Sequence, residues 1–100
     1  MADSDFLSGT RYTFSEENAA RAPEQLGVYQ IEDADSKVIY VGQGRIRDRL
    51  LSHFHSENDA DECIFSHHPT AYRREVCANA AARERAILAA HNTFCNVRVG

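Results

Sequence analysis

The stretch GVYQIEDADSKVIYVG, residues 27–42, places two apolar runs on either side of a short acidic turn. The alternation within each run predicts strands over 27–32 and 37–42, because successive side chains of a strand point to opposite faces. The intervening DADS is typical turn chemistry. Gly27 and Gly42 stand at the two outer ends of this predicted β-hairpin, where they either mark strand ends or allow another group to approach closely.

Two tyrosines face each other in the predicted hairpin. A four-residue turn sets Glu32 opposite Lys37, and the resulting register places Tyr29 opposite Tyr40 on one face of the sheet. Aromatic pairs across strands often serve packing alone, so the hairpin by itself leaves a structural and a functional interpretation open.

The rest of the chain is predicted to form a single α+β domain over residues 13–100, preceded by a flexible N-terminal tail, residues 1–12. Periodicity, a Thr-x-x-Glu capping box and an Asn cap indicate the other elements. These are helices over 14–22, 45–55 and 80–91, a loop with room for one helical turn over 56–69, a third strand over 72–77 and an extended C-terminal end.

Composition places the chain among globular proteins without a membrane segment. Of its 100 residues, 43% are hydrophobic and 26% charged, and no apolar run approaches the roughly 20 residues that span a bilayer. The N-terminus lacks the features of a secretory signal. The three cysteines are scattered and odd in number, which favours reduced thiols, so we expect a cytoplasmic protein.

The net charge of −4 argues against strong unaided binding to long duplex DNA. All but one of the eleven basic residues are arginines, which favours bidentate contacts with phosphates or carboxylates. Arg45, Arg47 and Arg49 fall within five residues, and Arg45 and Arg47 are candidate nucleic-acid contacts. A solvated face paired with acids is the alternative for this group.

The helix predicted over 45–55 carries two candidate site residues at the edge of its apolar stripe. Arg49 and His53 lie one turn apart, so both side chains reach the boundary of the core. The structural alternatives are an arginine whose stem covers apolar surface and a histidine at an ordinary edge position.

Glu84 occupies a core position of the last predicted helix. The inward stripe comprises Ala80, Ala81, Ile87 and Leu88, and Glu84 falls at its centre. An unpaired buried carboxylate costs several kcal/mol, so Glu84 must be neutralised, paired or bound to a cation. Periodicity leaves two options open, an ion pair with an arginine such as Arg49 and a one-carboxylate Mg²⁺ site.

A zinc site is a weaker candidate. Cys63, His67, His68 and Cys77 are potential ligands, but their spacing lacks the close pairs of common zinc modules. A polar loop end before a proline is the simpler interpretation of the two histidines.

Five elements in order resemble the GIY-YIG nuclease family. They are GVY at 27–29, YVG at 40–42, Arg49, Glu84 and Asn96. Each tripeptide alone is weak, but the ordered set covers nearly the whole predicted domain. The chain resembles a short stand-alone member of the family and is similar to the N-terminal nuclease domain of the excision-repair endonuclease subunit.

The resemblance implies a three-stranded antiparallel sheet flanked by helices and hydrolysis of phosphodiester bonds in DNA or another nucleic acid. It implies one divalent cation, Mg²⁺ or Mn²⁺, held by Glu84, with Arg49 as the cationic clamp on the phosphate. Both groups bind a transition state with extra negative charge more strongly than the ground state.

The remaining roles also come from the resemblance. Tyr29 and Tyr40 match the family tyrosines, His53 matches a histidine that relays a proton, and Asn96 matches an asparagine that orders the site. Gly27 and Gly42 belong to the supporting tripeptides. We favour Tyr29 as the base and Tyr40 as the residue that positions the water, although a metal-activated water serves equally well.

Two departures from the family pattern bear on activity. Gln43 follows the second tripeptide where many members have lysine, and the acidic chain leaves no room for a separate DNA-binding region. A partner protein could therefore contribute substrate affinity. The alternative function is a catalytically inactive member of the fold that binds a protein or nucleic-acid partner.

Overall fold

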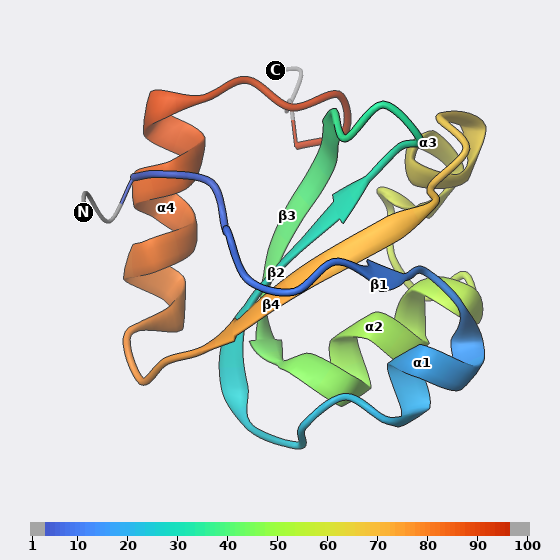
Figure 1. Cartoon of the computed structure of the whole chain (residues 1–100), viewed down its shortest axis with the longest axis horizontal. Helices are drawn as coiled ribbons and strands as arrows, with labels where there is room; N and C mark the ends of the chain where they lie inside the picture. Colours follow the sequence, from blue (N-terminus) through green and yellow to red (C-terminus); the bar gives the residue numbers. More distant parts are fainter. Residues whose placement is uncertain (1–3, 97–100) are drawn as a thin grey trace.

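A computed structural model describes residues 4–96 as an antiparallel sheet flanked by helices (Figure 1). The strand order is β1-β4-β2-β3. The α+β class is therefore confirmed, but the sheet has four strands, because a two-residue strand precedes the first helix. The elements are β1 (Tyr12–Thr13), α1 (Glu16–Ala20), β2 (Leu26–Glu32), β3 (Val38–Arg45), α2 (Ile46–Phe54), α3 (Asp61–Ser66), β4 (Ala71–Val76) and α4 (Ala80–Ala90).

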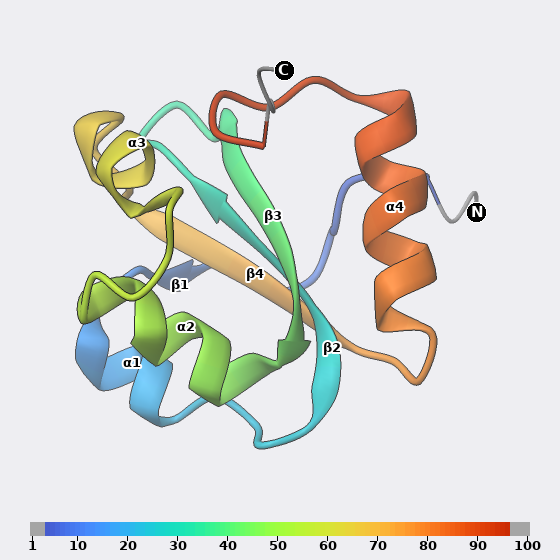
Figure 2. The same ribbon diagram turned by 180° about the vertical axis from the view of Figure 1, so that it is seen from behind.

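Helices cover both faces of the sheet, and the edge strand β3 runs between the two layers (Figure 2). On one face α1, α2 and α3 pack over a core that includes Tyr29, Ile31, Leu50 and Ile64. On the other face α4 packs on β2 and β3, and its cluster comprises Leu7, Val28, Val41, Ala80 and Ile87. Groups from both layers can therefore meet only around the β3 edge.

The predicted register of the hairpin is wrong by two residues. Tyr29 pairs with Gly42 and Tyr40 with Ile31, and a bulge follows at Glu32, which pairs with Val38. One residue of the shift arises because Lys37 bonds to Asp33, whose N–H donates to the Lys37 carbonyl, instead of pairing with Glu32; the bulge adds the second. A shift of two residues preserves the face, so the two tyrosines remain neighbours on one side, with ring centroids 6.3 Å apart.

Helix α4 is rotated relative to the predicted stripe. Ala80, Arg83 and Ile87 are buried, whereas Ala81 is exposed. Arg83 is accommodated by an ion pair of 3.1 Å with Glu75 and a bond to the Asp5 carbonyl. Glu84 therefore lies beside the buried stripe, half-buried, and not at its centre.

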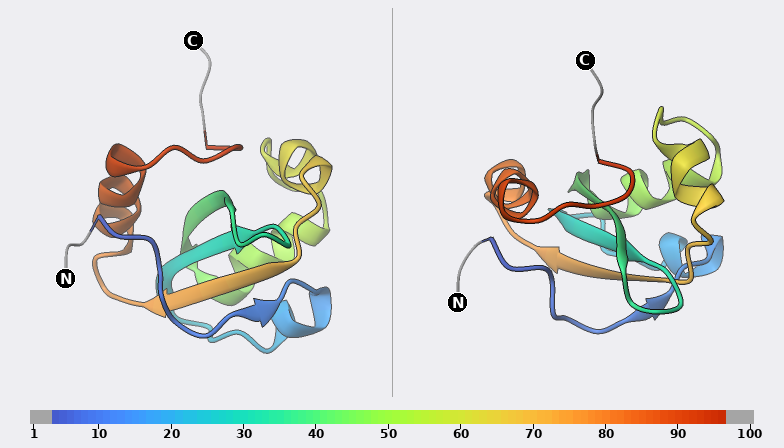
Figure 3. Two further views of the ribbon diagram at one scale, coloured as in Figure 1. Left: turned by 45° about the horizontal axis from the view of Figure 1, so that its top comes forward. Right: turned by 90° about the horizontal axis from the view of Figure 1, so that it is seen from above.

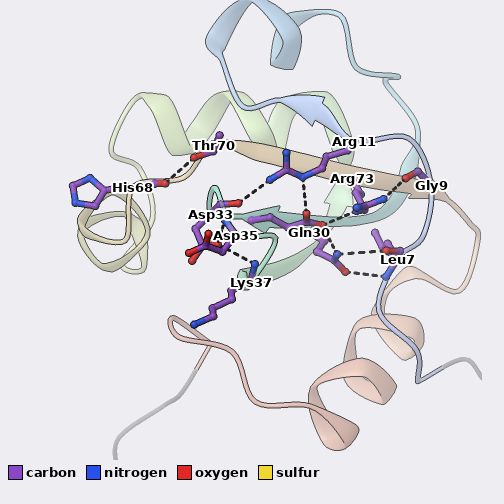
Figure 4. Close-up of polar contacts among 11 residues, drawn as sticks. Leu7, Gly9, Arg11, Gln30, Asp33, Asp35, Lys37, His68, Thr70 and Arg73 are labelled. Atoms are coloured by element: carbon purple, nitrogen blue, oxygen red, sulfur yellow. Dashed lines mark hydrogen bonds and ion pairs between the residues drawn. The ribbon is translucent and has the colours of Figure 1, made fainter.

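The segment expected to be a flexible tail is packed along the sheet over residues 4–12. Leu7 is 4% exposed, and its N–H donates to Gln30 Oε1 at 2.8 Å (Figure 4). Arg11 and Arg73 both donate to the buried carboxylate of Glu32, at 3.0 and 2.7 Å. Phe6 and Leu7 are an isolated apolar pair among polar residues and show no periodicity. The sequence therefore could not predict that residues 4–12, here called the N-terminal strap, pack on the sheet.

The other boundaries depart little from expectation. Helix α1 begins later than predicted, because Ser15 caps it by accepting from the N–H of Asn18 at 3.1 Å. The expected loop 56–69 contains α3, and the extended end expected after residue 93 lies partly outside the described residues. Within residues 4–96, no helix is both long and apolar enough to cross a bilayer.

The strap makes a testable contribution to stability. Leu7→Ala removes a buried side chain, so the free energy of unfolding should fall by about 2 to 4 kcal/mol. Leu26→Ala is the matched control, since Leu26 is 45% exposed and its removal should change stability by less than about 0.5 kcal/mol. Urea denaturation measures both, and equal small effects would contradict a docked strap.

Candidate functional site

A polar pocket of about 510 Å³ opens at the β3 edge. The segment after α4 crosses from that helix towards α3, past the first half of β3 (Figure 3). The polar residues that line the pocket are Tyr40, Asn58, Asp59, Glu84 and Asn96. The pocket thus joins a phenol from the sheet with a carboxylate from the opposite helical layer, as the sequence predicted for Tyr40 and Glu84.

A buried hydrogen-bonded chain of three side chains starts at Tyr29. The Tyr29 hydroxyl lies 2.6 Å from His53 Nε2, and His53 Nδ1 lies 2.6 Å from Asp61 Oδ1. Because a carboxylate only accepts, Nδ1–H donates to Asp61 and Nε2 accepts from the phenol. This arrangement fixes the tautomer of His53 and gives the Tyr29 proton an acceptor.

Burial is the largest influence on the pKa values of Tyr29 and His53. Removal from water raises the pKa of Tyr29, neighbouring Tyr40 adds to that effect, and the Arg49 guanidinium opposes it. Glu84 also raises the pKa of Tyr29, so the carboxylate and the phenol influence each other electrostatically. Burial lowers the pKa of His53, against the opposing effect of Asp61. The neutral forms of Tyr29 and His53 are therefore favoured.

Asn58 connects Arg49 to the same chain. Arg49 Nη2 donates to Asn58 Oδ1 at 2.8 Å, and the backbone N–H of Asn58 donates to Asp61 Oδ2 at 3.0 Å. The Asn58 amide also donates to Ser52 Oγ at 2.9 Å. Asn58 lines the pocket and Arg49 does not. The guanidinium of Arg49 is therefore connected to the pocket lining through its hydrogen bond to Asn58.

Gly42 and Gly27 each lie so close to neighbouring atoms that no side chain would fit there. A Cβ at Gly42 would lie 2.3 Å from the Tyr29 hydroxyl and ring, so any side chain there would displace the phenol. A Cβ at Gly27 would lie 2.3 Å from the Glu75 carbonyl and 2.6 Å from Ile46 Cδ1. Gly42 therefore shapes the site, whereas Gly27 serves the packing of β4 and α2.

Asn96 fastens the C-terminal segment to β3. Its side-chain oxygen accepts from the Val41 N–H at 2.8 Å, and its amide donates to the Val41 carbonyl at 2.9 Å. Thr93 Oγ1 also donates to Asn96 Oδ1, at 2.7 Å. Asn96 consequently forms one wall of the pocket beside Tyr40.

The two other arginines of the 45–49 cluster lie elsewhere. Arg47 donates to the Ala22 carbonyl at 2.8 Å and pairs with Glu24 at 2.9 Å, so it holds the chain after α1. Arg45 is exposed, with a bond of 3.3 Å to the Glu24 carbonyl. Neither belongs to the pocket lining.

Sequence reasoning missed Asp61 and Asn58. Both fall in the aperiodic stretch after α2, where acidic and amide residues are common and no spacing relates them to His53. The Asp61 carboxylate comes into contact with His53 Nδ1 only when the chain folds. A hint was available in the Asn58-Asp59-Ala60-Asp61 run, which resembles the start of a short helix.

The cysteines differ from expectation. Cys63 and Cys95 form a disulfide, and Cys77 is the free thiol among the described residues, so the prediction of three reduced thiols is wrong for this structure. The candidate zinc set is also not assembled as predicted. Cys63 and His67 cluster with Cys95, not with His68 and Cys77.

The lowered pKa of His53 predicts a specific pH dependence. Below about pH 6.5 the unfolded chain binds a proton at position 53 that the folded protein resists, so unfolding becomes easier as the pH falls. His53→Gln should remove this contribution, flattening the stability curve by up to about 1.4 kcal/mol per pH unit. Chemical denaturation between pH 4.5 and 7.5 measures it.

The control is His55→Gln, since His55 is exposed and pairs with Glu16 at the surface. Comparison of the two variants shows whether the flattening is specific to the buried histidine. Parallel curves for wild type and His53→Gln would show that His53 is not protected from protonation.

Comparison with known structures supports the architecture. Two crystal structures of the GIY-YIG N-terminal endonuclease domain of UvrC from Thermotoga maritima superpose with TM-scores of 0.70, at 23% and 24% sequence identity. Each alignment covers 82% of this chain and 93% of the other. Both are point mutants bound to the catalytic divalent cation of that enzyme. The chain therefore has a GIY-YIG-like fold.

No curated protein matches the sequence. A family model described as a domain of unknown function, DUF7508, matches residues 11–93. This range includes β1 and most of the elements around the pocket. The chain belongs to the DUF7508 family.

Proposed function

We propose that the protein is a divalent-cation-dependent nuclease that hydrolyses phosphodiester bonds in DNA or another nucleic acid. The observation that carries this proposal is the meeting of Glu84 and Tyr40 in one pocket, with Tyr29, His53 and Arg49 behind its wall. The likeness to the UvrC nuclease domain supports it at the level of fold.

The donor set of the pocket suits Mg²⁺ or Mn²⁺. Carboxylate, amide and phenol oxygens dominate its polar lining, and such hard ligands are the ones these cations prefer. Glu84 would hold one ion, and the volume of about 510 Å³ leaves room for water ligands and a phosphate. When bound, the cation adds positive charge beside the scissile phosphate.

Arg49 contributes the second positive charge. Its guanidinium already donates to Asn58 on the pocket wall, so a phosphate in the pocket could replace that neutral acceptor with a charged one. A fixed guanidinium stabilises the extra charge that develops on the phosphate oxygens in the transition state.

Tyr29 is proposed as the base and Tyr40 as the residue that orients the water. Because Tyr29 is fully buried and does not line the pocket, this proposal requires the water to reach its hydroxyl beside Tyr40. Tyr29 has a proton acceptor in His53, which is oriented by Asp61, and Arg49 favours its phenolate form. Neutralisation of Glu84 by a cation would remove one of the effects that raise the pKa of Tyr29. Tyr40 lines the pocket directly and can hold the water against the phosphate.

Glu84→Gln tests the cation ligand. Loss of the carboxylate should lower Mg²⁺- or Mn²⁺-dependent cleavage by at least about 100-fold, because the amide cannot neutralise the cation. Glu17→Gln is the control, with a side chain 73% exposed on α1 and paired with Arg21. Cleavage of duplex, flap, junction, single-stranded DNA and RNA is measured by gel. Inactive wild type on all substrates would favour a binding module instead.

Tyr29→Phe and Tyr40→Phe separate the two phenols. Loss of the base should lower kcat by at least about 100-fold and remove the pH dependence of kcat, whereas loss of the positioning phenol should leave that dependence in place. Single-turnover rates across pH 6 to 10 measure both. Tyr29→Phe activity with an unchanged pH profile would contradict Tyr29 as the base and transfer the role to Tyr40.

A further inference from the structure

Three potential metal ligands converge beside the pocket, apart from the carboxylate proposed for catalysis. Cys63 Sγ, Cys95 Sγ and His67 Nδ1 all lie within 4.8 Å of one another. Cys63 and His67 belong to α3 and its C-terminal end, whereas Cys95 lies on the segment after α4. Two regions far apart in sequence therefore contribute to one cluster of soft ligands.

The position of the imidazole matches a tetrahedral centre. His67 Nδ1 lies 3.8 Å from Cys63 Sγ and 3.7 Å from Cys95 Sγ, nearly equidistant from the two sulfurs. With zinc bonds of about 2.3 Å to sulfur and about 2.0 Å to nitrogen, tetrahedral angles place sulfur and nitrogen roughly 3.6 Å apart. For an ion to enter, the two sulfurs must separate and Nδ1 must release its hydrogen bond to the Cys63 carbonyl.

The imidazole is held in place independently of any ion. Its ring stacks on Phe94 with centroids 4.6 Å apart and planes 15° apart, and Nδ1 lies 2.9 Å from the Cys63 carbonyl. The stacking partner precedes Cys95 in the chain, so the ring and the second thiol are positioned by the same segment. In the disulfide form Nδ1–H donates to the carbonyl, and ligation would transfer that proton to Nε2.

We propose that the reduced protein binds one Zn²⁺ ion through Cys63, Cys95 and His67, with a water as the fourth ligand. A thiol reductant converts the disulfide to two thiols by giving two electrons and two protons and becoming a disulfide itself. A phosphine gives the two electrons and becomes a phosphine oxide, while water supplies the oxygen and the two protons. Binding of Zn²⁺ then releases both thiol protons, because the thiolate is the ligand. Both cysteines line the pocket, which gives the ion a path from solvent. This site does not depend on the proposed nuclease activity.

The cluster of Cys63, Cys95 and His67 favours a different kind of ion from the one that Glu84 would bind. Two thiolates and an imidazole favour Zn²⁺, whereas Mg²⁺ prefers oxygen ligands. Since Cys95 directly precedes Asn96, either the disulfide or the ion would fasten the Asn96 segment to α3. The ion would thus preserve in the reduced protein the connection that the disulfide makes in the oxidised one.

Zinc titration of the phosphine-reduced full chain against a chromophoric chelator tests the site. Wild type should bind one Zn²⁺, and its melting temperature should rise by on the order of 10 °C at 100 times Kd. Cys63→Ser and Cys95→Ser should lose binding, and His67→Ala should weaken it at least tenfold. Cys77→Ser and His68→Ala are matched controls that should bind as wild type does.

Thiol alkylation of the wild-type protein gives an answer independent of variant folding. Zn²⁺ should protect Cys63 and Cys95 from iodoacetamide, as read by mass spectrometry, and leave the reactivity of Cys77 unchanged. Equal alkylation of Cys63 and Cys95 with and without Zn²⁺ would overturn the proposal, as would zinc binding that survives Cys63→Ser but is lost in Cys77→Ser.

Discussion

The covering of the free edge of β3 by the segment after α4 is the interaction on which the pocket depends. β3 is the last strand of the sheet, so its outward backbone groups have no strand partner among residues 4–96. Asn96 satisfies both groups of Val41, and the Cys95 N–H donates to the Ile39 carbonyl at 2.9 Å. Each group left unpaired away from water would cost about 1 to 3 kcal/mol. The same bonds that complete the edge also close the pocket between α3 and α4.

The edge position also explains how two helical layers contribute to one site. Tyr29 comes from β2, His53 from α2 and Asp61 from α3, whereas Glu84 comes from α4 on the opposite face. A site in the middle of the sheet could not join them, because the strands would intervene. At the edge, Tyr40 and Asn96 line the same pocket as the Glu84 carboxylate. The missing side chain at Gly42 leaves space for the Tyr29 hydroxyl, so the glycine and the phenol form one structural unit.

Local sequence patterns predicted the helices and strands well. They could not predict contacts between residues that are distant in sequence. The strands around residues 27–42 and the helix of Arg49 and His53 follow from periodicity. The resemblance to an ordered set of motifs led us to expect Tyr40 and Glu84 near each other, and both line one pocket. The predicted register was wrong because the bulge and the Asp33–Lys37 backbone bond leave no trace in the side-chain pattern. Asp61, the docked Leu7 and the Cys63–Cys95 pair were missed for a related reason, since each acquires its partner only when the chain folds.

A crystal structure of the protein soaked with Mn²⁺, with anomalous diffraction to locate the ion, is the most direct test of the proposed site. The arrangement predicts one anomalous peak within bonding distance of a Glu84 carboxylate oxygen, on the side facing Tyr40. An empty pocket at saturating Mn²⁺, or a cation held only by surface carboxylates away from Glu84, would contradict it.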